Sequence, residues 1–539
     1  MSTTETKQSS NNSKFLKGTL ILAASSIVVK VIGSVNWIIL SRVLGGEGIG
    51  LYQMGFPIYL LAITLSSAGV PVAISIITSE KLANKDYRGA KRVFVVSLRL
   101  LFLTGLIFSS ILFFGADWMI ASGFIKDARA YYSIIALAPA VFFVTFLASF
   151  RGYLQGWQIM LPTAVSEVVE QLMRVFTMLL FAYMMMPYGL AKAAGGASMG
   201  AGVGAFCALL VLMWFYRRLK QQMREEMLAQ DTSQPVEGAW YITKRLLKLA
   251  LPVSLTSLML PVGANLDLFI VPQRLEVAGF TVRHATEFFG YLTGMAVPLV
   301  NLATIFTASM TISLVPSISE SKALGAAEAI RDKIRLAFRV AMIITFPCFM
   351  GLFFLAEDVA GLIYNAPNAA GAIQTMSIGI LFLGLHQIST GVLQGLGRTA
   401  IPVGNMILAC VVKVALGWWL TAIPALGIKG ASIATVADFA VAAVLNMFFI
   451  YRLTGFSLSM GSIIRPMLAS GVMGCVIYAV LAVTGEFGAW SVLFAMVAAV
   501  PSYGGALLAV GGLGKEDLQQ VPFIGRRMLA LGQRFGLFK

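Results

Sequence analysis

Long apolar runs alternate with short polar segments along the whole chain. A helix needs about 20 apolar residues to cross the roughly 30 Å of hydrocarbon in a bilayer, so each run of that length predicts one membrane-spanning helix. The predicted spans are 16–40, 51–79, 93–115, 131–150, 161–187, 191–216, 245–270, 288–316, 336–356, 374–396, 402–424, 427–451, 463–483 and 489–511. We therefore expect an all-α integral membrane protein with 14 transmembrane helices.

The second half of the chain repeats motifs of the first half at a spacing of about 240 residues. The segment GYLQGWQIMLP (152–162) resembles GVLQGLGRTAIP (391–402), and the Ser-Glu pair at 79–80 matches the pair at 319–320. Each copy holds six predicted spans, and an even number gives both copies the same orientation in the membrane. We expect two six-helix lobes related by a pseudo-two-fold axis, plus two C-terminal helices, as in many secondary transporters.

Composition supports the membrane assignment and excludes several kinds of chemistry. Hydrophobic residues make up 58% of the chain and charged residues only 12%, whereas soluble domains contain about 25% charged residues. The four cysteines lie far apart and the chain has only two histidines, so neither a disulfide framework nor a zinc site is predicted. No Walker loop and no HExxH motif occurs in the sequence. We expect neither an enzyme nor a bound cofactor.

Lys and Arg are distributed unequally between the loops, and cytoplasmic loops usually hold the excess. Five of them lie between 81 and 92 and six between 217 and 245, whereas the alternate loops offer mainly Arg42, Lys192 and Lys429. We therefore expect both termini in the cytoplasm. This topology, with attraction to an anionic inner leaflet, accounts for the net charge of +16, so no nucleic-acid partner is implied.

The repeat and the polar stretches divide the chain into five parts. We expect an N-terminal six-helix lobe at 1–216, a cytoplasmic linker at 217–244, a C-terminal six-helix lobe at 245–451, helices 13 and 14 at 452–511, and a basic cytoplasmic tail at 512–539. The tail ends in GRRMLALGQRFGLFK, which is basic and amphipathic, so it is expected to lie on the inner leaflet. Nothing in the sequence demands more than a monomer.

The segment SEVVEQLMR (166–174) places charged residues inside an apolar run. Glu167, Glu170 and Arg174 are spaced three and four residues apart, so they share one face of the fifth predicted helix. Each charge costs about 2.5–3.5 kcal/mol or more at the bilayer centre, so this face is expected to line a hydrated cavity that binds substrate. The alternative is a structural Glu170–Arg174 ion pair, which leaves Glu167 without an obvious partner.

Other predicted spans also contain polar residues. Lys30 and Asn36 lie in the first span, and Lys30 is about 15 residues from its start, too deep to reach the interface easily. Lys413 falls next to the position of Arg174 when the repeats are matched. Three fixed cations in a pocket of low dielectric constant would bind an anionic group such as phosphate. The sequence therefore predicts an anionic substrate.

Three residues are candidates for binding a coupling cation: Asp267 and Asn265 in the seventh span and Asn405 in the eleventh. Carboxylate and amide oxygens are the ligands that hard cations prefer. Charge within the cavity would also couple transport to the membrane potential, which is worth about 2.3 kcal/mol per charge per 100 mV. Either source could drive the transport step.

The segment LGGEGIGLYQMGFPIYLLAITLSSAGVP (44–71), within the longer stretch 30–75, resembles the polysaccharide-exporter branch of the multidrug/oligosaccharidyl-lipid/polysaccharide (MOP) flippase superfamily. The most similar type is the stage V sporulation protein B group, which is related to the MurJ-type lipid II flippases. The resemblance covers essentially the whole chain. Fourteen helices in a six-plus-six-plus-two arrangement also match the MurJ type, whereas the drug-extruding MATE branch usually has 12.

The resemblance implies two six-helix lobes around a central cavity, with helices 13 and 14 forming a groove for a lipid tail. It also implies transport of undecaprenyl-diphosphate-linked sugars across the bacterial cytoplasmic membrane, with a place in cell-wall synthesis or sporulation. Lys30 matches the first cation of helix 1 in the MurJ type. Asn36 lies near the second cationic position and is not basic, and helix 2 lacks the arginines of that type.

Our hypothesis is a flippase for a peptidoglycan precursor or a related polysaccharide unit, with membrane lipid and cell-wall synthesis proteins as expected partners. Lys30, Arg174 and Lys413 would hold the diphosphate of the lipid-linked sugar. One alternative is a MATE-like cation-coupled drug exporter, in which Glu167, Glu170 and Asp267 would be the main binding residues. Another alternative is a membrane partner that scaffolds a polysaccharide synthase and moves nothing.

Overall fold

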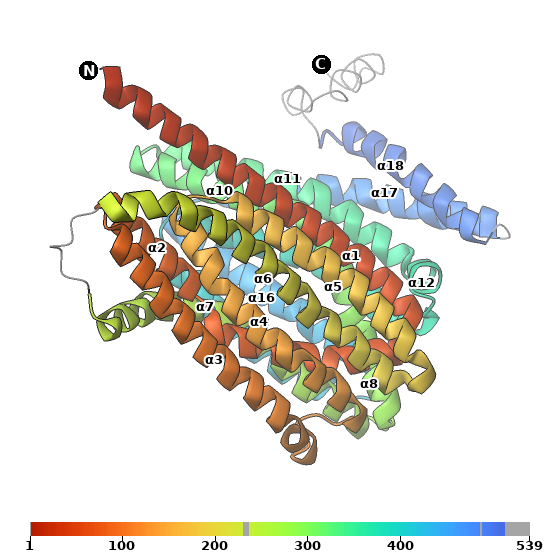
Figure 1. Cartoon of the computed structure of the whole chain (residues 1–539). Coiled ribbons are helices and arrows are strands. Elements are labelled where there is room, and N and C mark those ends of the chain that lie inside the picture. The colour runs from red at the N-terminus through yellow and green to blue at the C-terminus, as the bar shows by residue number, and fades with distance from the viewer. Residues whose placement is uncertain (1, 230–236, 486–487, 513–539) are drawn as a thin grey trace. The chain divides into compact units, whose positions relative to one another are not determined.

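A computed structural model of the chain describes residues 2–229, 237–485 and 488–512, which form helices joined by short turns and loops and contain no strand (Figure 1). The first half forms α1 (Ser2–Ser67), α2 (Val70–Ala83), α3 (Tyr87–Ala121), α4 (Tyr131–Gly156), α5 (Leu161–Met185), α6 (Leu190–Ala229) and α7 (Ala239–Val277). The second half forms α8 (Val282–Gly290), α9 (Val297–Ala303), α10 (Ile305–Ala323), α11 (Ala327–Phe354), α12 (Ala356–Asp358), α13 (Ala370–Ser377), α14 (Gly379–Gly395), α15 (Ala400–Leu420), α16 (Ile428–Thr454), α17 (Met460–Thr484) and α18 (Ala489–Ala509). Short 3-10 and π segments join them: η1 (Ala128–Ala130), η2 (Met186–Tyr188), η3 (Tyr291–Ala296), η4 (Val359–Ile363) and η5 (Pro367–Ala369).

Ten helices in the described part of the chain are long and apolar enough to cross a membrane, and 12 if each of two bent helix pairs counts as one span. Two predicted spans lie within one continuous helical stretch, Val28–Ala83, and α7 is not among the ten. The predicted number of 14 therefore stays a prediction. Residues 230–236 of the predicted linker and 513–539 of the predicted tail lie outside the described residues.

Two glycines interrupt the helical stretch that contains the first two predicted spans. α1 consists of two helices joined at a kink at Gly45, whose φ of 66° lies in the left-handed region that favours glycine. Gly69, with a φ of 75°, separates α1 from α2, and Pro71 follows in the first turn of α2. The break at Gly45 lies between the predicted spans 16–40 and 51–79, and the break at Gly69 lies inside the second of them.

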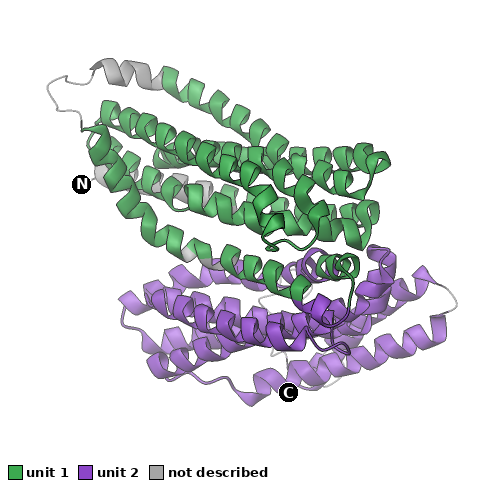
Figure 2. Cartoon of the chain, turned by 90° about the horizontal axis from the view of Figure 1, so that it is seen from below, with its two compact units in different colours: residues 1–273, 280–290 green, residues 274–279, 291–539 purple. Residues whose placement is uncertain are grey.

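The described chain forms two compact units, which Figure 2 shows in different colours. Unit 1 consists of Met1–Gln273 and Phe280–Gly290, and unit 2 consists of Arg274–Gly279 and Tyr291–Lys539. The body of α7 packs with unit 1, because Ser254 donates a hydrogen bond to the carbonyl of Ala68 at the end of α1. The predicted lobe boundary at residue 245 follows the sequence repeat and stays a prediction.

Residues that match in the repeat make matching contacts inside each unit. The Ser79 hydroxyl donates to the carbonyl of Gly156 (2.8 Å), and the Ser319 hydroxyl donates to the carbonyl of Gly395 (2.9 Å). These bonds join α2 to α4 and α10 to α14. A Cβ atom on Gly156 or Gly395 would lie 2.6 or 2.9 Å from a Cβ atom of the facing helix, so both helix pairs need glycine for close packing.

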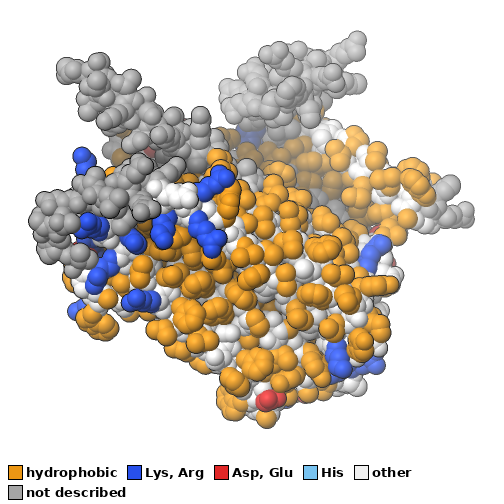
Figure 3. All heavy atoms as spheres, in the orientation of Figure 1, with side chains coloured by type: hydrophobic (Ala, Val, Ile, Leu, Met, Phe, Trp, Pro, Cys, Tyr) orange, Lys and Arg blue, Asp and Glu red, His pale blue; other side chains and the backbone are white. Residues whose placement is uncertain are grey.

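The surface of the helices is apolar, as expected where helices face lipid. Large hydrophobic side chains are exposed along α3 and α18, including Leu103 (56%), Phe114 (78%) and Val500 (74%). Figure 3 shows apolar side chains over the middle of one face, with Lys and Arg mostly toward its ends. α17 and α18 pack along each other in unit 2. An apolar surface of this extent would be costly in water, so the chain is a multi-pass membrane protein.

Candidate functional site

Three charged side chains of unit 1 form one cluster between α4 and α5, which we call the arginine–glutamate cluster: Arg151, Glu170 and Arg174. One carboxylate oxygen of Glu170 accepts from Nη2 of Arg174 (2.8 Å), and the other accepts from Nη2 of Arg151 (2.8 Å). The side chains are only 19%, 13% and 20% exposed for Arg151, Glu170 and Arg174. The Nε of Arg151 also donates to Ser166 (3.2 Å). Glu170 thus holds two guanidinium groups at once.

Glycines of α6 set the direction in which the charged face of α5 points. Gly196, Gly200 and Gly204 are spaced four residues apart and lie directly on α5. A Cβ atom on Gly204 would lie 2.6 Å from the backbone oxygen of Glu170, and one on Gly200 would lie 2.7 Å from that of Arg174. α6 therefore lies directly against α5 at Glu170 and Arg174, whose charged ends meet Arg151 of α4 and one another.

α1 supplies the remaining wall of this cluster. Tyr52 and Tyr59 are each 2% exposed, and both lie close enough to Arg174 to interact with its charge. Asn36, which is 5% exposed, donates from Nδ2 to the sulfur of Met178, one turn along α5 from Arg174 (3.1 Å). The other amide atom, Oδ1 of Asn36, is buried and has no hydrogen-bond partner in the described part of the chain.

Lys30 lies on a different face of α1 from the residues that face lipid. Val28, Val31 and Val35 are exposed along one face of the helix. Lys30 is also exposed, but together with Ser34, four residues on, it lies on another face. The Ser34 hydroxyl donates to the backbone carbonyl of Lys30 (3.0 Å). Lys30 is therefore accessible, on another face of the helix than these three valines.

Glu167 lies one turn from Glu170 and remains outside the ion pairs. It is half-buried, close to Arg151 and to Ser25 of α1. Within the described residues it forms no salt bridge. The Glu170–Arg174 pair considered as a structural alternative is thus present, but it is part of a larger group that also contains Arg151.

The predicted residues of α7 are both half-buried in unit 1. Asn265 donates from Nδ2 to the carbonyl of Pro57 on α1 and to that of Pro261 one turn back, both at 2.8 Å. Its donors are therefore used in joining α7 to α1, and only its side-chain oxygen remains for a cation. Asp267 lies two residues further along α7 and has a polar interaction of its own.

The predicted residues of α15 lie in unit 2, in different surroundings. Asn405 donates to Oδ1 of Asn446 (2.8 Å), and Nδ2 of Asn446 donates to Ser389 (3.2 Å) and Thr390 (3.1 Å). These four side chains form a buried network of neutral groups. Lys413 is half-buried on the same helix and has an interaction partner. Unit 1 therefore has the charged cluster and unit 2 has a neutral one.

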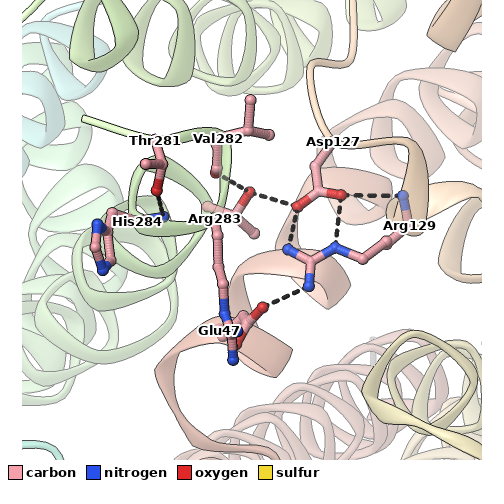
Figure 4. A network of polar contacts seen from close by, with 8 residues as sticks. Glu47, Asp127, Arg129, Thr281, Val282, Arg283 and His284 are labelled. Carbon is pink, nitrogen blue, oxygen red and sulfur yellow. Dashed lines mark hydrogen bonds and ion pairs between the residues drawn. The ribbon is translucent and has the colours of Figure 1, made fainter. Parts of the chain in front are cut away.

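A second polar group joins three segments of unit 1, and we call it the loop network (Figure 4). It consists of Glu47, Asp127, Arg129, Arg283 and Thr286. Figure 4 shows the guanidinium of Arg129 between Asp127 and Glu47, and Glu47 also accepts from Nε of Arg283 (2.9 Å). The Thr286 hydroxyl donates to Asp127 (2.8 Å). The start of α8 is thereby attached to α1 and to the segment before α4.

Asp127 accepts more hydrogen bonds than any other member of the loop network. The side chain is only 4% exposed, and burial alone would raise the pKa of its carboxyl group. Hydrogen bonds from Arg129 and Thr286 outweigh that effect and hold the pKa below its usual range. Asp127 is therefore ionised at neutral pH and holds Arg129 in place.

Glycines allow α8 to lie directly on α1 beside the loop network. A Cβ atom on Gly50 would lie 2.0 Å from the backbone oxygen of Thr286, and one on Gly290 would lie 2.3 Å from that of Gly46. Two of the glycines in LGGEGIG thus serve a backbone turn at Gly45 and a close helix contact at Gly50. This contact explains why α8 packs with unit 1.

Comparison with known families decides the membership of this chain. The model of the family described as polysaccharide biosynthesis protein matches residues 15–322, more than half of the sequence. The chain belongs to this family. A second family model, MatE, matches residues 293–419 of this chain.

Two curated relatives match this chain over almost its full length. Stage V sporulation protein B of Bacillus subtilis (strain 168) is 29% identical over 518 residues, which cover 96% of this chain and 99% of that protein. Lipid II flippase MurJ of the same organism is 24% identical over 544 residues, covering 96% and 98%. The predicted resemblance to stage V sporulation protein B and to the MurJ type is confirmed.

Solved structures share the fold of this family member. A lipid II flippase MurJ in an inward closed conformation aligns with a TM-score of 0.70 at 14% identity, over 93% of this chain and 100% of that chain. An inward-facing MATE family multidrug resistance transporter of the MOP superfamily aligns with a TM-score of 0.65 at 17% identity, over 81% and 98%. At these identities the likeness shows the fold, which is the membrane fold shared by MurJ and MATE proteins.

Arg151 was not among the predicted site residues. The fourth predicted span ended at residue 150, whereas α4 continues to Gly156, so Arg151 lies inside the helix and not in a loop. A signal was present in the repeat: Arg151 directly precedes GYLQG, and Thr390 directly precedes the matching GVLQG. The arginine–glutamate cluster therefore contains a cation that was not among the predicted residues.

Proposed function

We propose that this protein is an alternating-access flippase that moves an undecaprenyl-diphosphate-linked sugar from the inner to the outer leaflet. The sugar would belong to lipid II or to a related surface polysaccharide unit. The relatives named as stage V sporulation protein B and lipid II flippase MurJ support this proposal. The observation that carries it is the arginine–glutamate cluster, because two arginines that share one carboxylate inside a membrane-spanning unit suit an anionic substrate.

In this proposal the cations bind the diphosphate and the lipid stays in the membrane. Lys30, Arg174 and Lys413 hold the phosphate oxygens, and Asn36 offers an amide to the head group. The isoprenoid chain stays in lipid beside α17 and α18. No bond is made or broken, so the protein is not an enzyme. A cation bound at Asp267, Asn265 and Asn405, or the membrane potential, supplies the energy.

We further propose that the protein lies in the bacterial cytoplasmic membrane with both termini in the cytoplasm, acting as a monomer. The excess of Lys and Arg in the segments 81–92 and 217–245 supports this orientation. It places the loop network, with Glu47 and Arg283, on the outer side. Cell-wall synthesis proteins would then be neighbours that use the delivered sugar.

The test is movement of a fluorescent undecaprenyl-diphosphate sugar across liposomes that contain the purified protein. Wild-type protein should move the lipid, and a Lys30→Ala, Arg174→Ala double variant should move it at least about tenfold more slowly, because two charge-assisted contacts are lost. Arg99→Ala, which removes an exposed arginine from α3, is the matched control and should behave as the wild type. Equal movement by the double variant would remove these residues from the binding site.

A MATE-like cation-coupled drug exporter is the second candidate, favoured by the MatE match at 293–419. In that function Glu167, Glu170 and Asp267 would bind a cationic drug. Glu170 is poorly suited, because both of its oxygens already accept from arginines. Drug resistance on overexpression, without lipid movement in the liposome assay, would favour the exporter. Loss of envelope integrity on depletion would favour the flippase.

A further inference from the structure

Arg151 changes the charge of the cluster in which it lies. With Arg174 alone, Glu170 would form a neutral pair of the kind common in membrane helices. The second guanidinium, from Arg151, leaves one positive charge in excess among the three side chains. An excess charge in a place that is only 13–20% exposed is costly, and a purely structural pair would not need it.

The second repeat shows that packing does not require the arginine. The helices α4 and α14 carry the matched motifs GYLQG and GVLQG, and both pack against their partner helices through the glycines of these motifs. Thr390 stands at the position of Arg151 and accepts a hydrogen bond from Asn446 (3.1 Å). A neutral side chain therefore fills this position in unit 2, so the positive charge in unit 1 has another role.

One donor of the cluster is also without a partner. The Nε of Arg174 is buried and has no hydrogen bond in the described part of the chain. A buried N–H of this kind costs free energy unless an acceptor reaches it. An oxygen of a bound anion would provide that acceptor and would balance the excess charge at the same time.

We propose that Arg151 is a positioning residue for anion binding, which holds the arginine–glutamate cluster at one net positive charge so that it binds a phosphate-bearing group. The inference rests on the proposed function for the identity of that group, a lipid-linked diphosphate. The requirement for one net positive charge, which we call the charge rule, can be tested separately. Arg151 acts through Glu170: it engages one carboxylate oxygen, so that Glu170 does not fully neutralise Arg174.

Glu167 is the one nearby carboxylate that could cancel the excess charge. It lies close to Arg151 but forms no salt bridge within the described residues. Its charge still opposes an approaching anion through space. The proposal therefore requires that Glu167→Gln leaves anion binding as strong as in the wild type or strengthens it.

The experiment measures binding of inorganic pyrophosphate to the full-length protein in detergent by isothermal titration calorimetry. Arg151→Gln should weaken binding by about tenfold or more, because the remaining Glu170–Arg174 pair is neutral. Arg151→Lys keeps the charge but cannot reach Ser166 and Glu170 with one planar group, so it should weaken binding less than Arg151→Gln does. The decisive variant is Arg151→Gln with Glu170→Gln, which restores one positive charge through Arg174 and should recover most of the affinity. Arg99→Gln is the control and should not change binding.

Several outcomes would overturn the proposal. Pyrophosphate binding that is absent in the wild type, or unchanged in Arg151→Gln, would show that the cluster is not the anion site. The double variant could fail to recover affinity although its melting temperature stays near that of Arg151→Gln. That result would show that binding depends on the contacts of the Arg151 side chain and not on its charge.

The same variants separate this inference from the proposed function. If the wild type moves the fluorescent lipid but does not bind pyrophosphate, the flippase stands and the charge rule fails. If pyrophosphate binds with the expected pattern but no lipid moves, the anion site stands and the flippase fails. A result in which both succeed, with Arg151→Gln impaired in each, supports the two together.

Discussion

Asp127 shows how a single carboxylate can organise a loop. Its Oδ1 accepts from the backbone N–H of Arg129 (3.0 Å) and from Nε of the same residue (2.9 Å), and its Oδ2 accepts from Nη2 (2.7 Å). Thr286 adds a fourth hydrogen bond from α8. Because all four partners are donors, the arrangement suits only the ionised carboxylate.

Asp127→Asn should therefore lower the melting temperature in a way that depends on pH. The folded pKa of Asp127 lies below its usual value of about 3.9, so its contribution is fully present above that value and is lost as the pH falls through the folded pKa. We expect the difference in melting temperature between wild type and Asp127→Asn to stay constant from pH 8 to about pH 5 and to shrink below about pH 4. Melting curves of both proteins across this range provide the measurement. A difference that disappears between pH 5 and 7 would contradict the lowered pKa.

At the scale of residues, the spacing along one helix predicted one contact of the arginine–glutamate cluster and missed the other. The Glu170–Arg174 contact follows from four-residue spacing on one helix, so the sequence could predict it. The Arg151–Glu170 contact joins two helices, and no local pattern encodes which side chains of α4 face α5. The hydrogen bonds from Nδ2 of Asn265 to Pro57 and Pro261 were not predicted either, because the bond to Pro57 depends on how α7 packs. The role of Asn265 as a cation ligand stays a prediction.

Between elements, glycine position decides how closely helices approach. The four-residue spacing of Gly196, Gly200 and Gly204 gives α6 a smooth stripe, and α5 lies on it with its backbone. The charged face of α5 is fixed by this contact, since turning the helix would need space that the glycines do not provide. The stripe is visible in the sequence, but only the structure shows that α5 is the helix that uses it.

Gly204→Ala should disturb the cluster without changing any charge. The new methyl group would lie 2.6 Å from the backbone oxygen of Glu170, so α5 must shift, at an expected cost of about 1–3 kcal/mol. Gly404→Ala on α15 is the matched control, because no atom lies within 4 Å of its Cβ position and alanine favours the helix. We expect a lower melting temperature and weaker pyrophosphate binding for Gly204→Ala alone. Equal behaviour of the two variants would show that the α5–α6 contact has room to adjust.

Helix boundaries were the least predictable feature at the scale of elements. The apolar runs located the membrane helices because hydrocarbon thickness fixes their length. They could not predict that α4 extends six residues past 150, since polar residues near the interface remain helical. The error at residue 150 removed Arg151 from the predicted site.

At the scale of the whole molecule, each compact unit contains segments from separate parts of the chain. The sequence predicts two lobes joined by the linker 217–244, and this division stays a prediction. The chain passes between the two compact units at three places, after residues 273, 279 and 290. The end of α7 belongs to unit 2, where Arg274 donates to the carbonyl of Trp418 (2.8 Å) and lies over its ring. The following segment, Phe280–Gly290, belongs to unit 1. Hydrophobic pattern carries no information on such an exchange, because it depends on side-chain and glycine contacts between distant segments.

Glu47→Gln should release the segment 280–290 while the helices that follow stay unchanged. Glu47 is only 12% exposed and accepts from two arginines, so its neutralisation should cost about 1–2 kcal/mol. Amide hydrogen exchange in peptides from 280–290 should then speed up by about 5–30-fold, whereas peptides from α10, at Ile305–Ala323, should exchange as in the wild type.

The control for Glu47→Gln is Asp332→Asn, which removes the Arg335–Asp332 ion pair of two exposed side chains on α11 and should have almost no effect on exchange. If exchange in 280–290 and in α10 rises together after Glu47→Gln, the segment opens with unit 2 and its attachment to unit 1 is weak. If only 280–290 responds, the opening of this segment ends at η3 (Tyr291–Ala296). A π-helical turn suits that position, because its widened hydrogen-bonding pattern accommodates a local change of helix geometry.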